Sequence, residues 1–403
     1  MVLDIRRVHR NEYDLDAGKT VAAEGSGGAV IVARAPGRLH LLGEHGNTNS
    51  GLYLSAAIDR WLSVAVSQRK DTSLRFYAAD LSERKRTTVA SLKFRKEDRW
   101  ANHAKVAVQV FVDMGFPVRG LNFSFSGNIP QNLALASSRA MEVASAVALR
   151  YLFKAKIGET ELAKMLAATH AAYFGEETGI ADYIIGLSAR SDRFMSVDEA
   201  DFSVAKIRSP FCECRILIAD SRVPRLGIEA ELGARTRDLA SAAQSLSHGR
   251  KGASLRDFAE ADLIDSVGDL PEKVRRRSLH FVQEAQRVSD ACELLRRGDT
   301  QGFSKLVFHS HEGLRDLYEI SCPEIDWMVK RAQETPGVFG ARMAGEGFGG
   351  CTYAIVKDDA VEDYRQRLDD YERIFGFHQQ IHEVRIVAGS HIVSDDAPAA
   401  EHN

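Results

Sequence analysis

Three segments of the chain carry residues whose types and spacing could bind a ligand. Residues 33–45 place Arg38 shortly before the acid–imidazole pair Glu44 and His45. Residues 340–351 are rich in glycine, which lets two backbone segments approach each other closely. Residues 129–140 lie between an expected strand and an expected helix, where a phosphate-binding loop would be placed, yet they contain no glycine. Taken alone, Glu44 and His45 would indicate only a polar surface turn, and the glycines only a tight structural turn.

The composition is that of a soluble globular protein. The chain has 403 residues, 44% of them hydrophobic and 27% charged, with a net charge of -3 that gives no nucleic-acid footprint. The N-terminus has charges where a signal peptide needs an apolar core, and no apolar run approaches the ~18 residues of a membrane span. We therefore expect a cytoplasmic protein with no nucleic-acid or membrane partner.

The five cysteines are odd in number and scattered, which argues against a disulfide framework. Cys212 and Cys214 could form half of a metal site, but no His/Cys pair lies nearby in the sequence. Two ordinary thiols at a strand edge are the simpler interpretation.

Strand-like runs alternate with helix-like runs throughout, which predicts an α+β or α/β fold. A turn is expected at Pro36-Gly37, directly after the first strand. The strands are expected at residues 29–33, 62–67, 121–126, 216–220, 352–356 and 383–387, and the helices at 137–153, 228–247, 274–297, 322–335 and 360–375.

The combination of motifs resembles the galactokinases, a family of GHMP kinases. Residues 33–45 are similar to the family's sugar-binding signature and residues 340–351 to its C-terminal glycine-rich motif; residues 99–105 and 318–326 also resemble family segments. The resemblance implies an α+β, two-domain GHMP kinase fold with the active-site cleft between the domains. We expect an N-terminal domain at residues 1–213, a C-terminal domain at 214–394 and a disordered tail at 395–403.

On the sugar side, the resemblance implies that Glu44, His45 and Asn47 contact sugar hydroxyls. Asn47 stands where the family has an acidic residue, and an amide can donate as well as accept a hydrogen bond. The hydroxyl pattern that is recognised could therefore differ from that of galactose.

The resemblance also assigns the catalytic groups. Asp182 aligns with the catalytic aspartate, Gly179 with the glycine whose backbone faces the sugar, and Arg38 with the arginine that pairs with the aspartate. Such a pair keeps the carboxylate ionised and adds positive charge at the transition state. The alternative for Asp182 is a loop or helix-start aspartate. Tyr183 replaces a family glutamine.

On the nucleotide side, the chain departs from the family. Asn132, Leu133 and Ala134 stand where the family has glycines, and a leucine side chain could fill the phosphate space. Ser137 and Ser138 are retained, and Ser138 is a weak candidate metal ligand. Arg139 replaces a small residue; it could neutralise a phosphate, although occupation of the site or surface exposure is the favoured interpretation.

Further positions also depart from the residues of the family. His170 stands at the family's magnesium-ligand glutamate, and imidazole is a poor ligand for a hard cation; a helix histidine packed between the domains is the simpler interpretation. Pro224 interrupts a family arginine segment, Leu232 aligns with a tyrosine that borders the sugar, and Glu346 would repel phosphate if it faced the cleft.

Two hypotheses remain open at this point. The favoured one is a galactokinase-like sugar-binding protein whose nucleotide site is eroded: a sensor or pseudokinase, with a possible protein partner. The alternative is an active kinase that uses MgATP to phosphorylate the anomeric hydroxyl of galactose or a related sugar.

Overall fold

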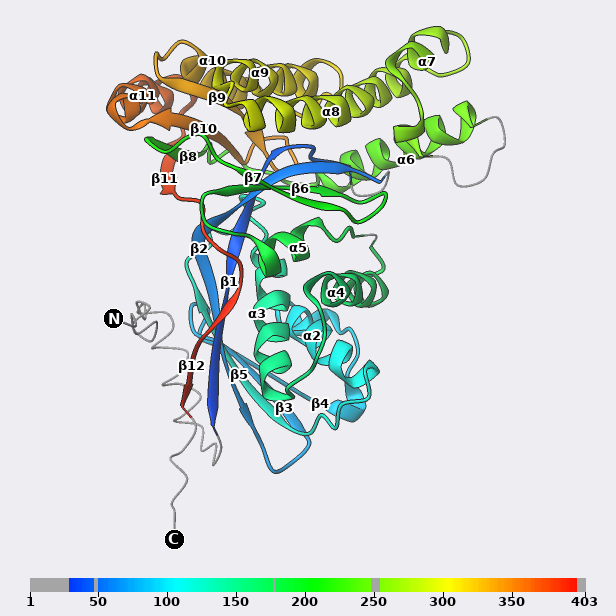
Figure 1. The fold of residues 1–403 in the computed structure, drawn as a ribbon, viewed down its shortest axis with the longest axis vertical. Helices are drawn as coiled ribbons and strands as arrows, with labels where there is room; N and C mark the ends of the chain where they lie inside the picture. Colours follow the sequence, from blue (N-terminus) through cyan, green and yellow to red (C-terminus); the bar gives the residue numbers. More distant parts are fainter. Residues whose placement is uncertain (1–28, 47–49, 177, 248–253, 397–403) are drawn as a thin grey trace.

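The computed structural model describes residues 29–46, 50–176, 178–247 and 254–396. These residues form two layered domains, each with a sheet covered by helices, stacked along the long axis of the molecule (Figure 1). The α+β, two-domain architecture expected from the sequence is confirmed.

The N-terminal domain is built on an eight-stranded sheet with the order β12-β1-β2-β5-β3-β4, and β6 and β7 extend it from β2. The pairing of β3 with β5 is parallel, and the other pairings are antiparallel. The strands are β1 (Val30–Leu42), β2 (Leu52–Gln68), β3 (Ser73–Ala78), β4 (Glu83–Thr88), β5 (Leu121–Gly127), β6 (Arg193–Asp198), β7 (Val204–Arg208) and β12 (His391–Asp396).

Four helices cover one face of this sheet (Figure 1). They are α2 (Ala101–Asp113), α3 (Ser137–Leu152), α4 (Glu159–Phe174) and α5 (Ala181–Ser188), with short 3-10 turns at Val89–Ser91 and Lys96–Asp98. Their apolar faces and the inward side chains of β1, β2 and β5 form one continuous buried core.

The C-terminal domain contains a four-stranded antiparallel sheet with the order β11-β8-β10-β9. Its strands are β8 (Cys214–Asp220), β9 (Val338–Ala344), β10 (Cys351–Lys357) and β11 (Gln380–Val384). Its helices are α6 (Glu229–Leu246), α7 (Glu260–Asp265), α8 (Glu272–Arg297), α9 (Thr300–Asp316), α10 (Pro323–Gln333), α11 (Val361–Leu368) and α12 (Asp370–Phe375), with 3-10 turns at Leu255–Asp257 and Asp358–Ala360. None of the helices in the described ranges is long and apolar enough to cross a membrane.

The turn expected at Pro36-Gly37 is wrong. β1 continues through both residues, and its register against β2 shifts between them, so the dipeptide forms an irregularity within a long strand. Glycine suits this position because a Cβ atom would make a tight contact, 3.1 Å from the carbonyl oxygen of Leu135 in the loop that precedes α3. The bulge therefore brings the strand and the loop into contact.

The expected C-terminal boundary also needs correction. β12 pairs with β1 on the edge of the N-terminal sheet, with Ala33 opposite Ile392 and Arg34 opposite His391. The chain therefore leaves the second domain after β11 and returns to the first, and residues 395 and 396 lie in a strand, not in a tail. Residues 397–403 are outside the described ranges. Helix α9 was not expected from the sequence, and α11 and α12 were expected as one helix.

The two domains meet over the end of β1. The hydroxyl group of Tyr353, on β10, donates a hydrogen bond of 2.6 Å to the carbonyl oxygen of Leu41, and both residues are fully buried. Because a buried carbonyl without a partner is costly, this bond helps to fix where the second domain sits on the first.

We expect Tyr353→Phe to lower the free energy of unfolding by about 1–2 kcal/mol, because it leaves the buried oxygen of Leu41 without this donor. Urea unfolding of the variant against wild type measures the change. Tyr77→Phe, at a partly exposed tyrosine on β3, is the matched control and should change stability little. Equal stability of the two variants would contradict the role given to the Tyr353 bond.

Candidate functional site

A cavity of about 490 Å³ lies where the two domains meet. It gathers most of the residues that the sequence singled out: Arg38, Glu44, His45, Asn132, Ala134, Ser137, Ser138, Arg139, Gly179 and Asp182. His170 is buried nearby and does not line it, and Asn47 lies outside the described residues.

The floor of the cavity is an ion pair between the first strand and the start of α5. Arg38 donates from Nε and Nη2 to the two carboxylate oxygens of Asp182, at 2.7 and 2.8 Å. Burial alone would raise the pKa of Asp182, but the charge of Arg38 and a hydrogen bond from His40 outweigh it and hold the pKa well below its usual range. Asp182 is therefore a fixed, ionised acceptor.

His40 is a site residue that the sequence analysis did not single out. Its Nε2 lies 3.3 Å from Asp182, its Nδ1 lies 2.6 Å from the Ser55 hydroxyl, and its ring stacks on Tyr53. Burial, aided by the charge of Arg38, lowers the pKa of His40 to about 4, so the ring is neutral and donates to Asp182. The sequence did contain a feature that could have identified His40. It lies two residues after Arg38, and alternate residues of a strand point to the same face.

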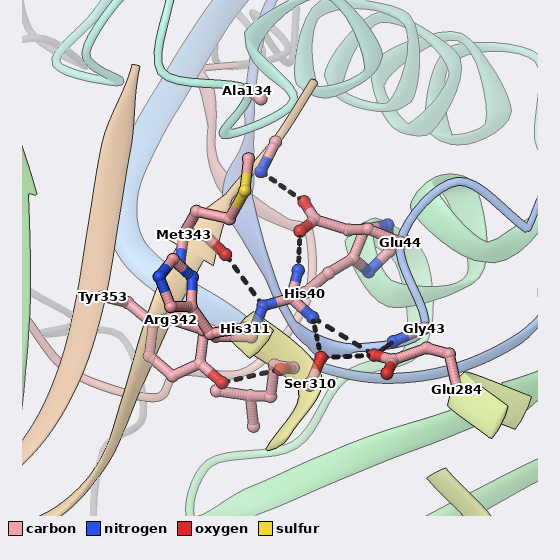
Figure 2. A network of polar contacts seen from close by, with 12 residues as sticks. His40, Gly43, Glu44, Ala134, Glu284, Ser310, His311, Arg342, Met343 and Tyr353 are labelled. Atoms are coloured by element: carbon pink, nitrogen blue, oxygen red, sulfur yellow. Dashed lines mark hydrogen bonds and ion pairs between the residues drawn. The ribbon is translucent and has the colours of Figure 1, made fainter. Parts of the chain in front are cut away.

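Glu44 is held by a buried polar network that joins the two domains (Figure 2). Its carboxylate pairs with Arg342 of β9 and accepts a hydrogen bond from the backbone N–H of Gly345. Arg342 also lies 3.3 Å from Glu284 and 3.1 Å from the Ser310 hydroxyl. Glu44 thus lines the cavity, but both of its oxygens already have a protein partner.

The second acid of this network carries a stable charge. Burial would raise the pKa of Glu284, but the charge of Arg342 outweighs it and holds the pKa at about 2. Glu284 also accepts from the backbone N–H of Gly43 at 3.0 Å, next to Glu44 in the chain. The turn that ends β1 is therefore fixed by the C-terminal domain from two sides.

His45 offers an unused polar atom at the cavity. Its Nε2 is buried without a hydrogen-bond partner, and its ring contacts Tyr318, with ring centroids 5.1 Å apart. Burial lowers the pKa of His45 to about 4, so the ring is neutral. A buried imidazole nitrogen without a partner is costly unless a ligand satisfies it.

A carboxyl group that the sequence analysis missed lies behind Gly179. A Cβ atom at Gly179 would lie 1.8 Å from Oε1 of Glu199, so a side chain there would displace this carboxyl group. Glu199 accepts a hydrogen bond of 3.1 Å from the N–H of Ala181, at the start of α5, and lines the cavity. Burial raises the pKa of Glu199 to about 7. No motif marked this residue, because it follows β6 far along the chain.

The loop before α3 keeps a strongly bent backbone without glycine. Asn132, Ala134 and Ala136 have φ angles of 62°, 54° and 60°, in the left-handed region that normally favours glycine. The expectation that Leu133 could fill the phosphate space is wrong, since its side chain is buried in the core of the first domain. Alanine can adopt this conformation at a cost of order 1 kcal/mol, which the surrounding contacts must offset.

Those contacts engage every carbonyl group from residue 132 to residue 136. Arg38 binds two of them, with its N–H on Leu135 O and its Nη1 on Ala134 O. The carbonyls of the other three residues accept from Arg225 Nη2, Cys351 Sγ and the N–H of Ala140, respectively. No carbonyl of this loop is therefore left free to repel an anion. Ser137 and Ser138 follow at the N-terminus of α3, where the helix dipole favours negative charge.

Arg139 lies in the first turn of α3 and lines the cavity, with 20% of its side chain exposed. Its guanidinium lies 3.1 Å from His170 Nδ1, 3.3 Å from the Thr178 hydroxyl and 3.6 Å from Glu142. The expectation of simple surface exposure is therefore wrong, while occupation of the site, or binding of a phosphate there, stays a prediction.

Behind Arg139 lies a buried cluster that could itself hold a metal ion. Ligand atoms of His103, Glu142 and His170 lie within 4.8 Å of one another, a set suited to Zn²⁺ and not to Mg²⁺. One oxygen of Glu142 contacts Nδ1 of both histidines, at 2.7 and 2.8 Å, and the hydroxyl of Tyr183 donates to the other oxygen at 2.6 Å. His170 is packed within the first domain, against Phe174, and not between the domains as expected.

The C-terminal domain supplies the opposite wall of the cavity. Arg225, placed by the segment that contains Pro224, lines it and binds the carbonyl of Asn132. Glu346 is 60% exposed and lies 3.8 Å from Arg225, so its charge is partly balanced. Leu232 lines a neighbouring depression instead of this cavity.

Cys212 is exposed and Cys214 is partly buried, and neither thiol forms a disulfide among the described residues.

Models of known families match most of the described chain. The galactokinase galactose-binding signature matches residues 23–68, the GHMP kinases N terminal domain residues 102–189, and the GHMP kinases C terminal model residues 291–372. Among solved structures, that of Lactococcus lactis galactokinase complexed with galactose superposes with a TM-score of 0.85 at 25% identity, covering 90% of this chain and 95% of that one. The mevalonate kinase of Methanococcus jannaschii, at 18% identity and a TM-score of 0.62, shares the fold.

Curated relatives align over nearly their whole length. A putative galactokinase of Treponema pallidum (strain Nichols) is 38% identical over 367 residues, which cover 90% of this chain and 92% of that protein. A galactokinase of Roseiflexus sp. (strain RS-1) is 31% identical over 373 residues, covering 92% and 95%. On this evidence the chain belongs to the galactokinase family of GHMP kinases.

Proposed function

We propose that this protein is an active sugar kinase that transfers the γ-phosphoryl group of MgATP to the anomeric hydroxyl of galactose or a related sugar. The observation that carries the proposal is the bidentate Arg38–Asp182 pair at the floor of a cavity that also contains the bent loop before α3. Phosphoryl transfer depends mainly on positioning and charge, and these two features supply both.

The sugar is proposed to bind on the side of His45 and Gly179. The unpartnered Nε2 of His45 can hydrogen-bond a hydroxyl, and the backbone of Gly179 lines the cavity beside the carboxyl group of Glu199. Glu44 retains lone pairs besides those used by Arg342 and Gly345, so it can accept from a further hydroxyl.

Asp182 is proposed to orient the attacking hydroxyl. A carboxylate with a pKa held this low is a weak base, so it accepts a hydrogen bond in the ground state and takes the proton only as the hydroxyl oxygen bonds to phosphorus. Arg38, bound to the same carboxylate, stabilises charge on the transferring group.

The phosphates are proposed to bind along residues 132–139. The satisfied carbonyls, the N-terminus of α3 and the hydroxyl groups of Ser137 and Ser138 fit an anionic ligand. Mg²⁺, which when bound neutralises phosphate charge, would find oxygen ligands in Ser138 and Glu176, both at the cavity, and none in His170.

The substitutions at residues 132–134 had favoured a sensor or pseudokinase. The named relatives support the active kinase better, and the loop bends without glycine, so we propose the kinase.

The test is turnover of MgATP with a panel of sugars, measured as ADP formed and as sugar 1-phosphate. We expect sugar-dependent turnover, and Asp182→Asn should lower kcat by at least about 100-fold, because the neutral amide neither pairs with Arg38 nor accepts the proton. Asp71→Asn is the matched control, since Asp71 makes a bidentate pair with Arg69 at the surface, at 2.8 and 2.7 Å.

If the protein binds galactose but turns over MgATP with none of the sugars, the kinase proposal is refuted and a sugar sensor is favoured instead. Equal kcat values of the Asp182 and Asp71 variants would refute the role of Asp182.

The free energy of unfolding is expected to depend on pH through Glu199. Because burial raises the pKa of Glu199 in the folded protein to about 7, above that of an exposed glutamate, Glu199 contributes stability at low pH that is lost as pH rises through 7. Wild type should lose about 1–3 kcal/mol of unfolding free energy relative to Glu199→Gln between pH 5 and pH 8. Urea unfolding of both proteins at the two pH values measures this, and parallel pH profiles would show that Glu199 is not the titrating group.

A further inference from the structure

Arg139 is out of place by the ordinary rules of helix electrostatics. It occupies the first turn of α3, a 16-residue helix, where the positive end of the helix dipole disfavours a cation. A side chain placed against this gradient needs either a compensating acid or an anionic ligand.

The compensating acid is Glu142, one turn further along the same helix. Burial would raise the pKa of Glu142, but its hydrogen bonds with His103 and His170 and the charge of Arg139 hold it at about 2. The residue is fully buried and therefore cannot leave the cluster for solvent. It fixes the position of the guanidinium from the inner side.

The contacts of Arg139 leave donors unused. His170 Nδ1 can either donate to Glu142 or accept from Arg139, but one nitrogen cannot do both. The Nε–H of Arg139 is buried without a partner, while each terminal nitrogen makes one hydrogen-bond contact and therefore keeps an N–H to spare. A guanidinium that is fixed from behind, lines the cavity and keeps terminal N–H groups to spare is arranged to bind an oxyanion.

The groups around Arg139 are also compatible with a bound oxyanion. The carbonyls of the loop point at protein donors, Asp182 is neutralised by Arg38, and Ser137 and Ser138 precede Arg139 directly. On the opposite wall, a second guanidinium, that of Arg225, borders the same space; its Nη1 makes no hydrogen bond and lies 3.8 Å from the carboxylate of Glu346.

We propose that Arg139 binds the phosphate groups of the nucleotide directly and supplies charge that makes phosphate binding largely independent of a divalent cation. This inference rests on the proposed function for the identity of the ligand, but the anion site can be tested without turnover. His170, turned toward Glu142 and Arg139, then serves as part of the support for the guanidinium and not as a metal ligand.

The probes are inorganic tripolyphosphate and ATP, titrated calorimetrically into the full-length protein, once with Mg²⁺ and once with EDTA. We expect wild type to bind tripolyphosphate in EDTA, and Arg139→Gln to weaken that binding by about 10- to 100-fold. Arg139→Lys should give an intermediate loss, since it keeps the charge and loses the planar set of donors. Arg150→Gln, in the last turn of the same helix and away from the cavity, should stay within about twofold of wild type.

Thermal unfolding of each variant separates loss of binding from loss of fold, and Arg139→Lys remains informative if Arg139→Gln does not fold. Binding of tripolyphosphate by wild type only when Mg²⁺ is present would overturn the inference. Equal affinity of wild type and both Arg139 variants in EDTA would overturn it as well.

The two proposals fail separately. A wild-type protein that phosphorylates no sugar, but loses anion binding on Arg139→Gln, would refute the kinase and support the Arg139 site.

Discussion

The site depends on Arg38 more than on any other side chain. Its guanidinium binds Asp182 at the start of α5 and the carbonyl of Ala134, and its backbone N–H binds the carbonyl of Leu135. One residue of β1 therefore holds together the start of α5 and the loop before α3. The bulge at Pro36-Gly37 makes this possible, because Gly37 lets the loop backbone approach the strand within van der Waals distance.

A second constraint acts between the domains. Arg342 is fully buried between Glu44 of the first domain and Glu284 of the second, and a buried charge is tolerated only if it is paired and hydrogen-bonded (Figure 2). Removing Arg342 would leave two buried carboxylates without the cation that they share, so the network favours one arrangement of the turn after β1 relative to β9. That arrangement is what presents His45 to the cavity.

Much of the site could be predicted from the sequence because its residues lie in compact motifs. Arg38, Gly179 and Asp182 were placed by resemblance, and α3 by its apolar periodicity. Arg342 and Glu199 were missed because their partners lie far away in the chain, at Glu44 and near Gly179, and no local pattern records such a contact. β12 was missed for a related reason: a short polar segment becomes a strand only when the edge of β1 is available to it.

In the loop before α3, tertiary contacts outweigh the backbone preferences of the individual residue types. Glycine is favoured at positive φ because it avoids a steric cost, but that cost is small enough to be offset when neighbouring groups fix the backbone. Here Arg38, Arg225 and Cys351 bind the loop carbonyls, and Leu133 anchors the loop in the core. The absence of glycine therefore says little about whether the bend exists. It bears instead on what can approach the bend closely, because each added Cβ atom keeps a ligand further from the backbone N–H groups. A longer-reaching donor then becomes useful, and the guanidinium of Arg139, held at the adjacent helix turn by Glu142, has that reach.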